Sequence, residues 1–367
     1  MYSCIICGHP TNNLKLLTKK CVAPMGNKLF PLNLLKCKKC GHIQKKIDNK
    51  WKSAMKNLYE KKYIFIGKHI TVHKNKVYDR NKLITGVIDK YLKLSSKGDF
   101  LDIGCGAGYF VKSFLELKKN WNVYAHDLNY LNKKKVIKYK IKFFFTGGVN
   151  KINKKFDLIS MNHVVEHLTE PKKVLLDVHK LLKDNGKLVI RLPNIKKVHN
   201  DLTVLDHCSH FTKESLTNLL YLSGFKVDRF FNEINPTELF VIATKMQKKN
   251  IKRIIFSHLT KKEINNLNWL EKVCKKIEND KSNLSLGLFG VGTSTFYLYA
   301  RLKNKIDFFV DEDPSKINNY YYKKKIYSTQ KIPKKSKIFI AVHNYVFARK
   351  IAKRLKKRNP LINYIAA

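Results

Sequence analysis

The chain has 367 residues with 44% hydrophobic content, which predicts two or three globular domains and excludes a disordered chain. Its formal net charge is +47, but only eight of the 74 basic residues are arginine, and the lysines are spread along the whole chain. We interpret this charge as compositional, because a nucleic-acid groove more often gathers arginine and aromatic residues on one element. Attraction to polyanions or phosphorylated substrates is the alternative.

No apolar run reaches the roughly 20 residues that span a bilayer. The first residues, MYSCIICGHP, show no basic region followed by an apolar core, so no signal peptide is expected. We therefore expect a soluble cytoplasmic protein without a membrane span. The sequence does not determine its oligomeric state, and a monomer is compatible with it.

Two C-x2-C pairs near the N-terminus predict a metal site. Cys4 and Cys7 are separated by 29 residues from Cys37 and Cys40, and a glycine follows each pair. Four thiolates suit tetrahedral Zn²⁺, whereas a single pair could also be a redox site. A closed four-cysteine site stabilises a fold and does no chemistry. We therefore predict structural Zn²⁺ in a zinc-binding module of residues 1–62.

Residues 75–245 alternate between helix and strand patterns and predict an α/β domain. An apolar strand ends at Ile103, a glycine-rich turn follows over 104–108, and the segment YFVKSFLEL begins a helix. Such glycines permit a tight turn and close approach of a ligand to the backbone. The next strand ends at Asp127, whose carboxylate can accept the hydroxyls of a ribose. A dinucleotide fingerprint would need glycine where Tyr109 stands.

The D-x-G-x-G-x-G segment that begins at Asp102 resembles motif I of the class I S-adenosylmethionine-dependent methyltransferases. Residues 154–194 resemble that family's fourth strand, the helix after it and the fifth strand. The resemblance implies a Rossmann-like fold and S-adenosylmethionine as the cofactor. The residues that it assigns to cofactor binding are Asp102, Gly104, Cys105, Gly106, Gly108, Asp127 and Asn162.

Methyl transfer needs an aligned acceptor and, where necessary, a base, and ligands of open α/β sheets bind beyond the carboxyl ends of the strands. One candidate cluster there is MNHVVEHLTEP. His163, Glu166 and His167 follow the predicted strand at helical spacing, so His163 and His167 should share a helix face. An acceptor-side role for His167, a structural role and metal binding are the alternatives for this cluster.

The second cluster is VLDHCSHFT, residues 204–212, which precedes a predicted helix that Thr212 caps and Gly224 ends. Asp206 stands next to His207 and can support this imidazole as a base. A metal site that includes His210 and a nucleophilic role for Cys208 are the less favoured alternatives, because methyl transfer needs neither.

After a predicted helical linker over residues 246–283, a second strand–glycine turn–helix–strand pattern begins. Gly290 and Gly292 occupy its turn, and Asp311 ends its next strand. Residues 284–367 therefore predict a small Rossmann-like domain. Glycines alone are weak support for a second cofactor site there.

The order of these parts resembles the zinc-containing nucleotide-sugar C-methyltransferases of deoxysugar pathways, over nearly the whole chain. The segments CKKCGHIQ, LYEKKYIF, WLEKVCKKIENDK and GVGTSTFYL…FFVDEDPSK carry this resemblance. It implies that a 4-keto nucleotide-linked sugar is methylated at carbon through an enolate. The catalytic residues that it implicates are His167, Asp206, His207 and Tyr63.

One departure from that family concerns the second cluster. The family commonly has Tyr-x-Glu-His where this chain has Val204-Leu205-Asp206-His207. A hydroxyl acceptor would need only His207 as a base, so O-methylation of a sugar or another small molecule stays open. A zinc-bearing RNA methyltransferase is a further alternative, although a nucleic acid is not the expected partner.

Overall fold

The structure is a computed structural model that describes residues 2–23, 26–49, 51–53, 55, 70–73, 76–198, 200–231, 234–247, 254–314, 316–342 and 345–367. The chain separates into two compact units. Unit 1 comprises Met1–Asn13, Leu34–Lys197 and Cys208–His258, and unit 2 comprises Leu14–Asn33, Val198–His207 and Leu259–Ala367. The four domain ranges given above remain a prediction.

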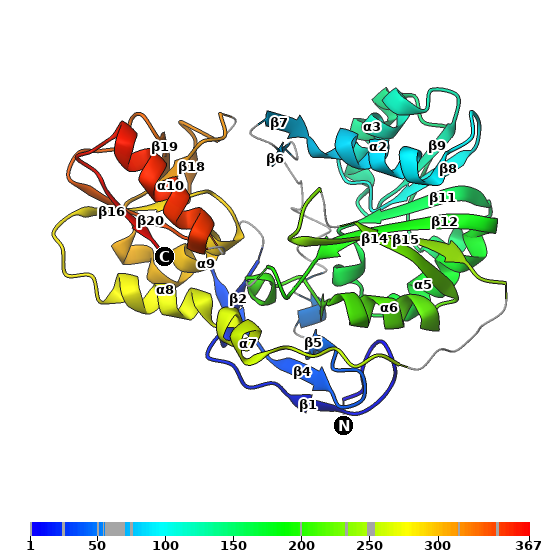
Figure 1. Cartoon of the computed structure of the whole chain (residues 1–367), viewed down its shortest axis with the longest axis horizontal. Coiled ribbons are helices and arrows are strands. Elements are labelled where there is room, and N and C mark those ends of the chain that lie inside the picture. The colour runs from blue at the N-terminus through cyan, green and yellow to red at the C-terminus, as the bar shows by residue number, and fades with distance from the viewer. Residues whose placement is uncertain are drawn as a thin grey trace. The chain divides into compact units, whose positions relative to one another are not determined.

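Unit 1 contains a seven-stranded sheet in the order β10-β9-β8-β11-β12-β15-β14 (Figure 1). Its strands are β8 (Asp99–Ile103), β9 (Asn122–His126), β10 (Phe143–Phe145), β11 (Phe156–Asn162), β12 (Leu182–Pro193), β14 (Phe225–Phe231) and β15 (Glu238–Lys245). Neighbouring strands are parallel except at β15, which is antiparallel to both β12 and β14. The direction of winding therefore reverses between β8 and β11, and such a reversal opens a crevice at the carboxyl ends of the strands.

Helices cover both faces of this sheet because its central strands are apolar on both sides. On one face lie α2 (Arg80–Leu92) and α3 (Tyr109–Leu117), and on the other lie α5 (Pro171–Leu181) and α6 (Lys213–Leu222). The predicted cap of α6 is confirmed, since Thr212 Oγ1 accepts a hydrogen bond from the N–H of Ser215 at 3.2 Å. Gly224 follows this helix at φ +87°, as a helix-ending glycine should.

Short elements complete unit 1. They are α4 (Lys133–Val136) and the 3₁₀ turns η1 (Tyr130–Asn132), η2 (Ile137–Tyr139), η3 (Val149–Lys151) and η4 (Val165–His167). A separate four-stranded sheet has the order β1-β4-β5-β13, with β1 (Thr11–Asn13), β4 (Leu34–Cys37), β5 (Ile43–Lys45) and β13 (Ser209–His210). A two-stranded hairpin, β6 (Ile70–His73) and β7 (Lys76–Asp79), precedes α2.

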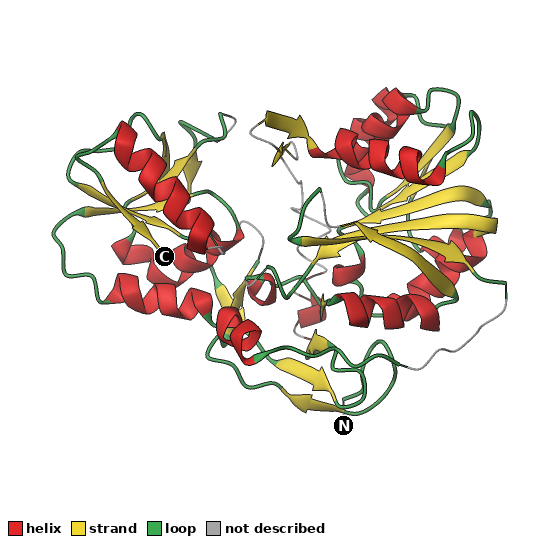
Figure 2. Ribbon diagram, viewed as in Figure 1, coloured by secondary structure: helices red, strands yellow, loops and turns green. Residues whose placement is uncertain are grey.

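Unit 2 contains a six-stranded sheet in the order β18-β19-β17-β16-β20-β21, which Figure 2 shows as strands between helices. Its strands are β16 (Ser285–Phe289), β17 (Phe308–Asp311), β18 (Tyr320–Tyr321), β19 (Lys324–Ser328), β20 (Ser336–Ile340) and β21 (Asn363–Ala366). All neighbours are parallel except β18 and β19. Without β18, the strand order repeats that of the first five strands of the unit 1 sheet, and it reverses between β16 and β20.

The helices of unit 2 also lie on both faces of its sheet. The cores place α8 (Trp269–Glu278) and α9 (Thr293–Leu302) on one face and α10 (Tyr345–Arg358) on the other. The remaining elements are α7 (Lys261–Leu267), β2 (Lys20–Val22), β3 (Leu29–Pro31), η5 (Asp201–Thr203) and η6 (Lys303–Lys305). The predicted α/β fold with a second Rossmann-like sheet is confirmed. Within the described part of the chain, no helix is both long and apolar enough to cross a membrane.

Candidate active site

The predicted glycine turn joins β8 to α3 and leaves its backbone open. Gly104, Gly106 and Gly108 have φ values of +70°, +52° and +76°, in the left-handed region that favours glycine. A Cβ on Gly104 would lie 2.4 Å from Cγ2 of Val164, whereas a Cβ on Gly106 would have no atom within 4 Å. The space over Gly106 is therefore available to a ligand that contacts the backbone.

Asp127 follows β9 and lies beside this turn, as predicted. The N–H of Gly106 donates a hydrogen bond to its Oδ2 at 2.8 Å, and the N–H of Asn129 donates to its Oδ1 at 2.8 Å. Each carboxylate oxygen has a further lone pair, so the fixed carboxylate can still accept ribose hydroxyls. The open backbone of the turn and the accepting carboxylate of Asp127 fit the adenosyl part of S-adenosylmethionine.

Asp102 is 2% exposed at the end of β8. Ser160 Oγ donates to its Oδ1 at 2.5 Å, and Asn162 Nδ2 donates to the same oxygen at 3.3 Å. Burial nevertheless raises the pKa of Asp102 to about 7. The charge of this residue therefore changes in the neutral range, and a bound ammonium group would hold it ionised.

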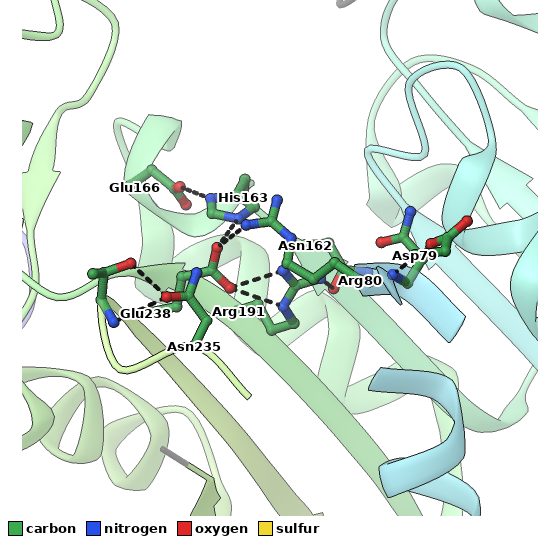
Figure 3. A network of polar contacts seen from close by, with 10 residues as sticks. Asp79, Arg80, Asn162, His163, Glu166, Arg191, Asn235 and Glu238 are labelled. Atoms are coloured by element: carbon green, nitrogen blue, oxygen red, sulfur yellow. Dashed lines mark hydrogen bonds and ion pairs between the residues drawn. The ribbon is translucent and has the colours of Figure 1, made fainter. Parts of the chain in front are cut away.

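Asn162 ends β11 and bonds to Asp102. It also contacts the buried ion-pair network that Figure 3 shows. Its Oδ1 accepts a hydrogen bond from Arg191 Nη1 at 3.3 Å. Arg191 Nη2 lies 2.8 Å from Glu238 Oε2, and the side chains are 2% and 7% exposed. Arg80 Nη1 lies 2.8 Å from Glu238 Oε1. Although burial alone would raise it, these guanidinium groups hold the pKa of Glu238 well below its usual range.

His163 follows Asn162 and lies between two carboxylates of this network (Figure 3). Its Nδ1 is 3.2 Å from Glu166 Oε1, and its Nε2 is 3.2 Å from Glu238 Oε1. Burial alone would lower the pKa of His163, but the two carboxylates raise it. The predicted helical spacing is wrong here, since His163 has φ +53° and only residues 165–167 form a 3₁₀ turn.

No motif pointed to Arg191, Glu238 or Arg80. A signal was present, because Arg191 interrupts the apolar run LVIRLP and Glu238 begins the run ELFVIATK. A charged residue in a buried strand needs a partner of opposite charge. That rule predicts that Arg191 and Glu238 need partners, but it does not predict which residues the partners are.

His207 belongs to the segment of unit 2 between residues 198 and 207. Its Nδ1 lies 2.6 Å from Oδ1 of Asp201, which is 2% exposed. Sequence reasoning missed Asp201 and named Asp206, the adjacent acid, which is 1% exposed. Val204 is 9% exposed.

The remaining predicted residues are placed as follows. His167 ends η4, and its carbonyl accepts a hydrogen bond from Cys208 Sγ at 3.2 Å. Cys208 is fully buried, and its N–H donates to the carbonyl of Glu166 at 2.7 Å. These contacts give Cys208 a packing role. Tyr63 lies outside the described residues.

The four N-terminal cysteines come together in unit 1. Sγ of Cys4 lies 3.6 Å from that of Cys40, and Sγ of Cys7 lies 3.5 Å from that of Cys37 and 3.6 Å from that of Cys40. Four sulfurs at about 2.3 Å from one Zn²⁺ would lie about 3.8 Å apart. Burial raises the pKa of Cys7 to about 12, an effect that a bound cation would oppose. The donor set fits a closed tetrahedral site.

A family comparison agrees with this geometry. Residues 77–229 match the model of a methyltransferase domain. The class of protein is defined by the strand order, by the open glycine turn and by the acids at the ends of β8 and β9. The protein is an S-adenosylmethionine-dependent methyltransferase.

No curated protein matches the chain. Among solved structures, an S-adenosylmethionine-dependent methyltransferase from Clostridium acetobutylicum is 15% identical over 46% of this chain and 93% of its own, with a TM-score of 0.40. YcgJ from Bacillus subtilis is 12% identical over 45% and 98%, with a TM-score of 0.37. A mitomycin 7-O-methyltransferase is 15% identical over 45% of this chain and 53% of its own, with a TM-score of 0.40. These TM-scores lie below 0.5, so the class rests on the family match and the strand order.

Proposed function

We propose that this methyltransferase acts on a sugar, by C-methylation of a 4-keto nucleotide-linked deoxysugar through an enolate. The observation that carries the proposal is the 2.6 Å contact between His207 Nδ1 and Asp201 Oδ1. An imidazole supported by a buried carboxylate is the arrangement that removes a proton from a weak acid. The resemblance of nearly the whole chain to nucleotide-sugar C-methyltransferases supports the choice of acceptor.

S-Adenosylmethionine, when bound, supplies an electrophilic methyl group, and its sulfur keeps the electrons of the broken bond. We assign Asp102, Gly106, Asp127 and Asn162 to holding it. Nε2 of His207 accepts the C3 proton of the keto sugar, and the electrons of the C–H bond enter the enolate. Asp201 keeps a proton on Nδ1 and stabilises the imidazolium that forms. In this proposal the roles of Asp206 and His167 are to line the acceptor side.

We further propose that the four-cysteine cluster holds structural Zn²⁺. The sulfur separations of 3.5–3.6 Å support this, because they are close to those of a tetrahedral thiolate site. The cluster leaves no ligand position for a substrate, so the metal stabilises the fold. Methyl transfer does not use it.

O-Methylation of a sugar is the second candidate. The observation that favours it is Val204, a buried apolar side chain at the position where the C-methyltransferases that this chain resembles commonly have tyrosine. A hydroxyl acceptor is activated by one base, and His207 suffices for that step.

The test is incubation of the full chain with labelled S-adenosylmethionine and a panel of 4-keto nucleotide sugars, reduced sugars and tRNA. Exchange of deuterium into C3 of a keto sugar, lost in His207→Ala, is the expected result. His258→Ala, a change at an exposed histidine, is the matched control. Label on oxygen would replace C-methylation by O-methylation, and label on tRNA alone would overturn the sugar assignment.

A further inference from the structure

Helix α10 of unit 2 carries more positive charge than any other helix that the structure describes. Seven of its 14 residues are lysine or arginine, and none is acidic. Three of the chain's eight arginines are among them, namely Arg349, Arg354 and Arg358. By comparison, α8 sets Glu271 and Glu278 against three lysines. An even spread of lysine along the chain does not account for arginines that gather on one helix.

The charge of α10 lies on the side that faces solvent. The residues that the helix buries against the core of unit 2 are Ala348, Ile351 and Leu355. On the opposite side, Lys350, Lys353 and Lys357 follow Val346 at spacings of three and four residues, so these four side chains share one face. All four are exposed, and we call them the outer face of α10. Among the described residues, no carboxylate forms an ion pair with these three lysines.

The first turn of α10 is apolar and exposed. Tyr345, Val346 and Phe347 are 56%, 64% and 56% exposed. Single exposed apolar residues are ordinary, but a contiguous group of them marks an interaction site. The helix itself cannot enter a lipid phase, because its buried side already packs on the sheet. A partner therefore meets an apolar turn that continues into a basic face.

This combination fits an anionic lipid surface better than it fits RNA. Anionic headgroups attract lysine, and apolar side chains enter the boundary between headgroups and acyl chains. RNA binds aromatic and arginine side chains but has no use for an aliphatic one such as Val346. Two of the arginines are also engaged, since the Arg349 guanidinium lies 5.9 Å from the ring of Tyr345 and Arg354 Nη2 lies 2.6 Å from Glu312 Oε2.

We propose that the outer face and the first turn of α10 dock unit 2 on the surface of an anionic lipid bilayer. The lysines lie among the headgroups, and Val346 with its two neighbours enters the boundary with the acyl chains. The contact is peripheral, because the apolar side of the helix stays buried in unit 2. This inference goes beyond the proposed function and does not depend on the identity of the acceptor.

The test is sedimentation of the full chain with phosphatidylcholine vesicles that contain or lack phosphatidylserine, at physiological ionic strength. We expect binding only to the vesicles with phosphatidylserine. A lysine near such a surface strengthens binding about fivefold, so the variant K350Q/K353Q/K357Q should bind about a hundredfold more weakly. Val346→Ser should weaken binding about tenfold, because its methyl groups no longer leave water.

The matched control is K272Q/K275Q/K276Q, the same charge change at exposed lysines of α8 on the other face of the same sheet. This variant should bind the vesicles as the wild type does. Amide hydrogen exchange in β16 and β20 should be unchanged in every variant, which shows that unit 2 remains folded.

Equal losses in the two triple variants would overturn the proposal, because net charge alone would then explain the binding. Absence of vesicle binding by the wild type would overturn it as well. A third contrary result is binding to a homopolymer RNA in preference to the vesicles, with Val346→Ser unaffected.

Discussion

Replacing Glu238 by glutamine removes a negative charge that Arg191, Arg80 and His163 all contact. The shape of the side chain is kept, so the change in stability reports on charge. Arg191 is 2% exposed, so water cannot take the place of the carboxylate. Removing one partner of a buried ion pair costs about 3–5 kcal/mol, because the remaining charge stays buried without compensation. We expect E238Q to lower the free energy of unfolding of unit 1 by about that amount.

Amide hydrogen exchange in strands β12 and β15 reads this loss locally, which suits a chain with two units. The matched control is Glu312→Gln, whose partner Arg354 is 46% exposed. A surface pair of this kind contributes about 0–1 kcal/mol. A loss below about 1 kcal/mol in E238Q would refute the reasoning.

The pH dependence of the same variant has a definite sign. The pKa of Glu238 is held below its usual value of 4.5, so its ionisation stabilises the fold fully above that pH. This contribution disappears as the pH falls through the folded-state pKa. The difference in stability between the wild type and E238Q should therefore narrow on acidification.

Three further predictions concern the cofactor turn, the cysteine cluster and the candidate base. The pKa of Asp102 is raised from 3.8 to about 7, so the free energy of unfolding without S-adenosylmethionine should fall by up to about 4 kcal/mol as the pH rises from 3.8 to about 7. Denaturation of D102N should lack this dependence of stability on pH. Cys7→Ser should lose about one equivalent of bound zinc by elemental analysis and lower the melting temperature, and retained zinc would contradict the four-thiolate site. Asp201→Asn should lower kcat by about 10²–10⁴-fold and Asp206→Asn by less, and the reverse order in a methylation assay would restore Asp206 as the supporting acid.

Local patterns determined the elements on both sides of the first glycine turn. The predicted helix YFVKSFLEL is α3, and the predicted strand before Gly104 is β8. These predictions are confirmed. The spacing of hydrophobic residues, the position of a glycine and the capping residues are local properties, so a short segment of sequence is enough to show them. The spacing of the two C-x2-C pairs likewise predicts one cluster of four sulfurs, and the four side chains do gather in unit 1.

Contacts between distant segments were decided only by the tertiary structure. Asp206 is next to His207 in sequence, yet the acid at 2.6 Å is Asp201, because the turn η5 brings it back to the imidazole. Arg191 and Glu238 are 47 residues apart and meet because β12 and β15 are antiparallel neighbours. The sequence by itself determined that this chain is a methyltransferase with a glycine turn and two C-x2-C pairs. Which carboxylate contacts which cation depends on chain turns and on strand pairing, and these bring together residues that no local pattern connects.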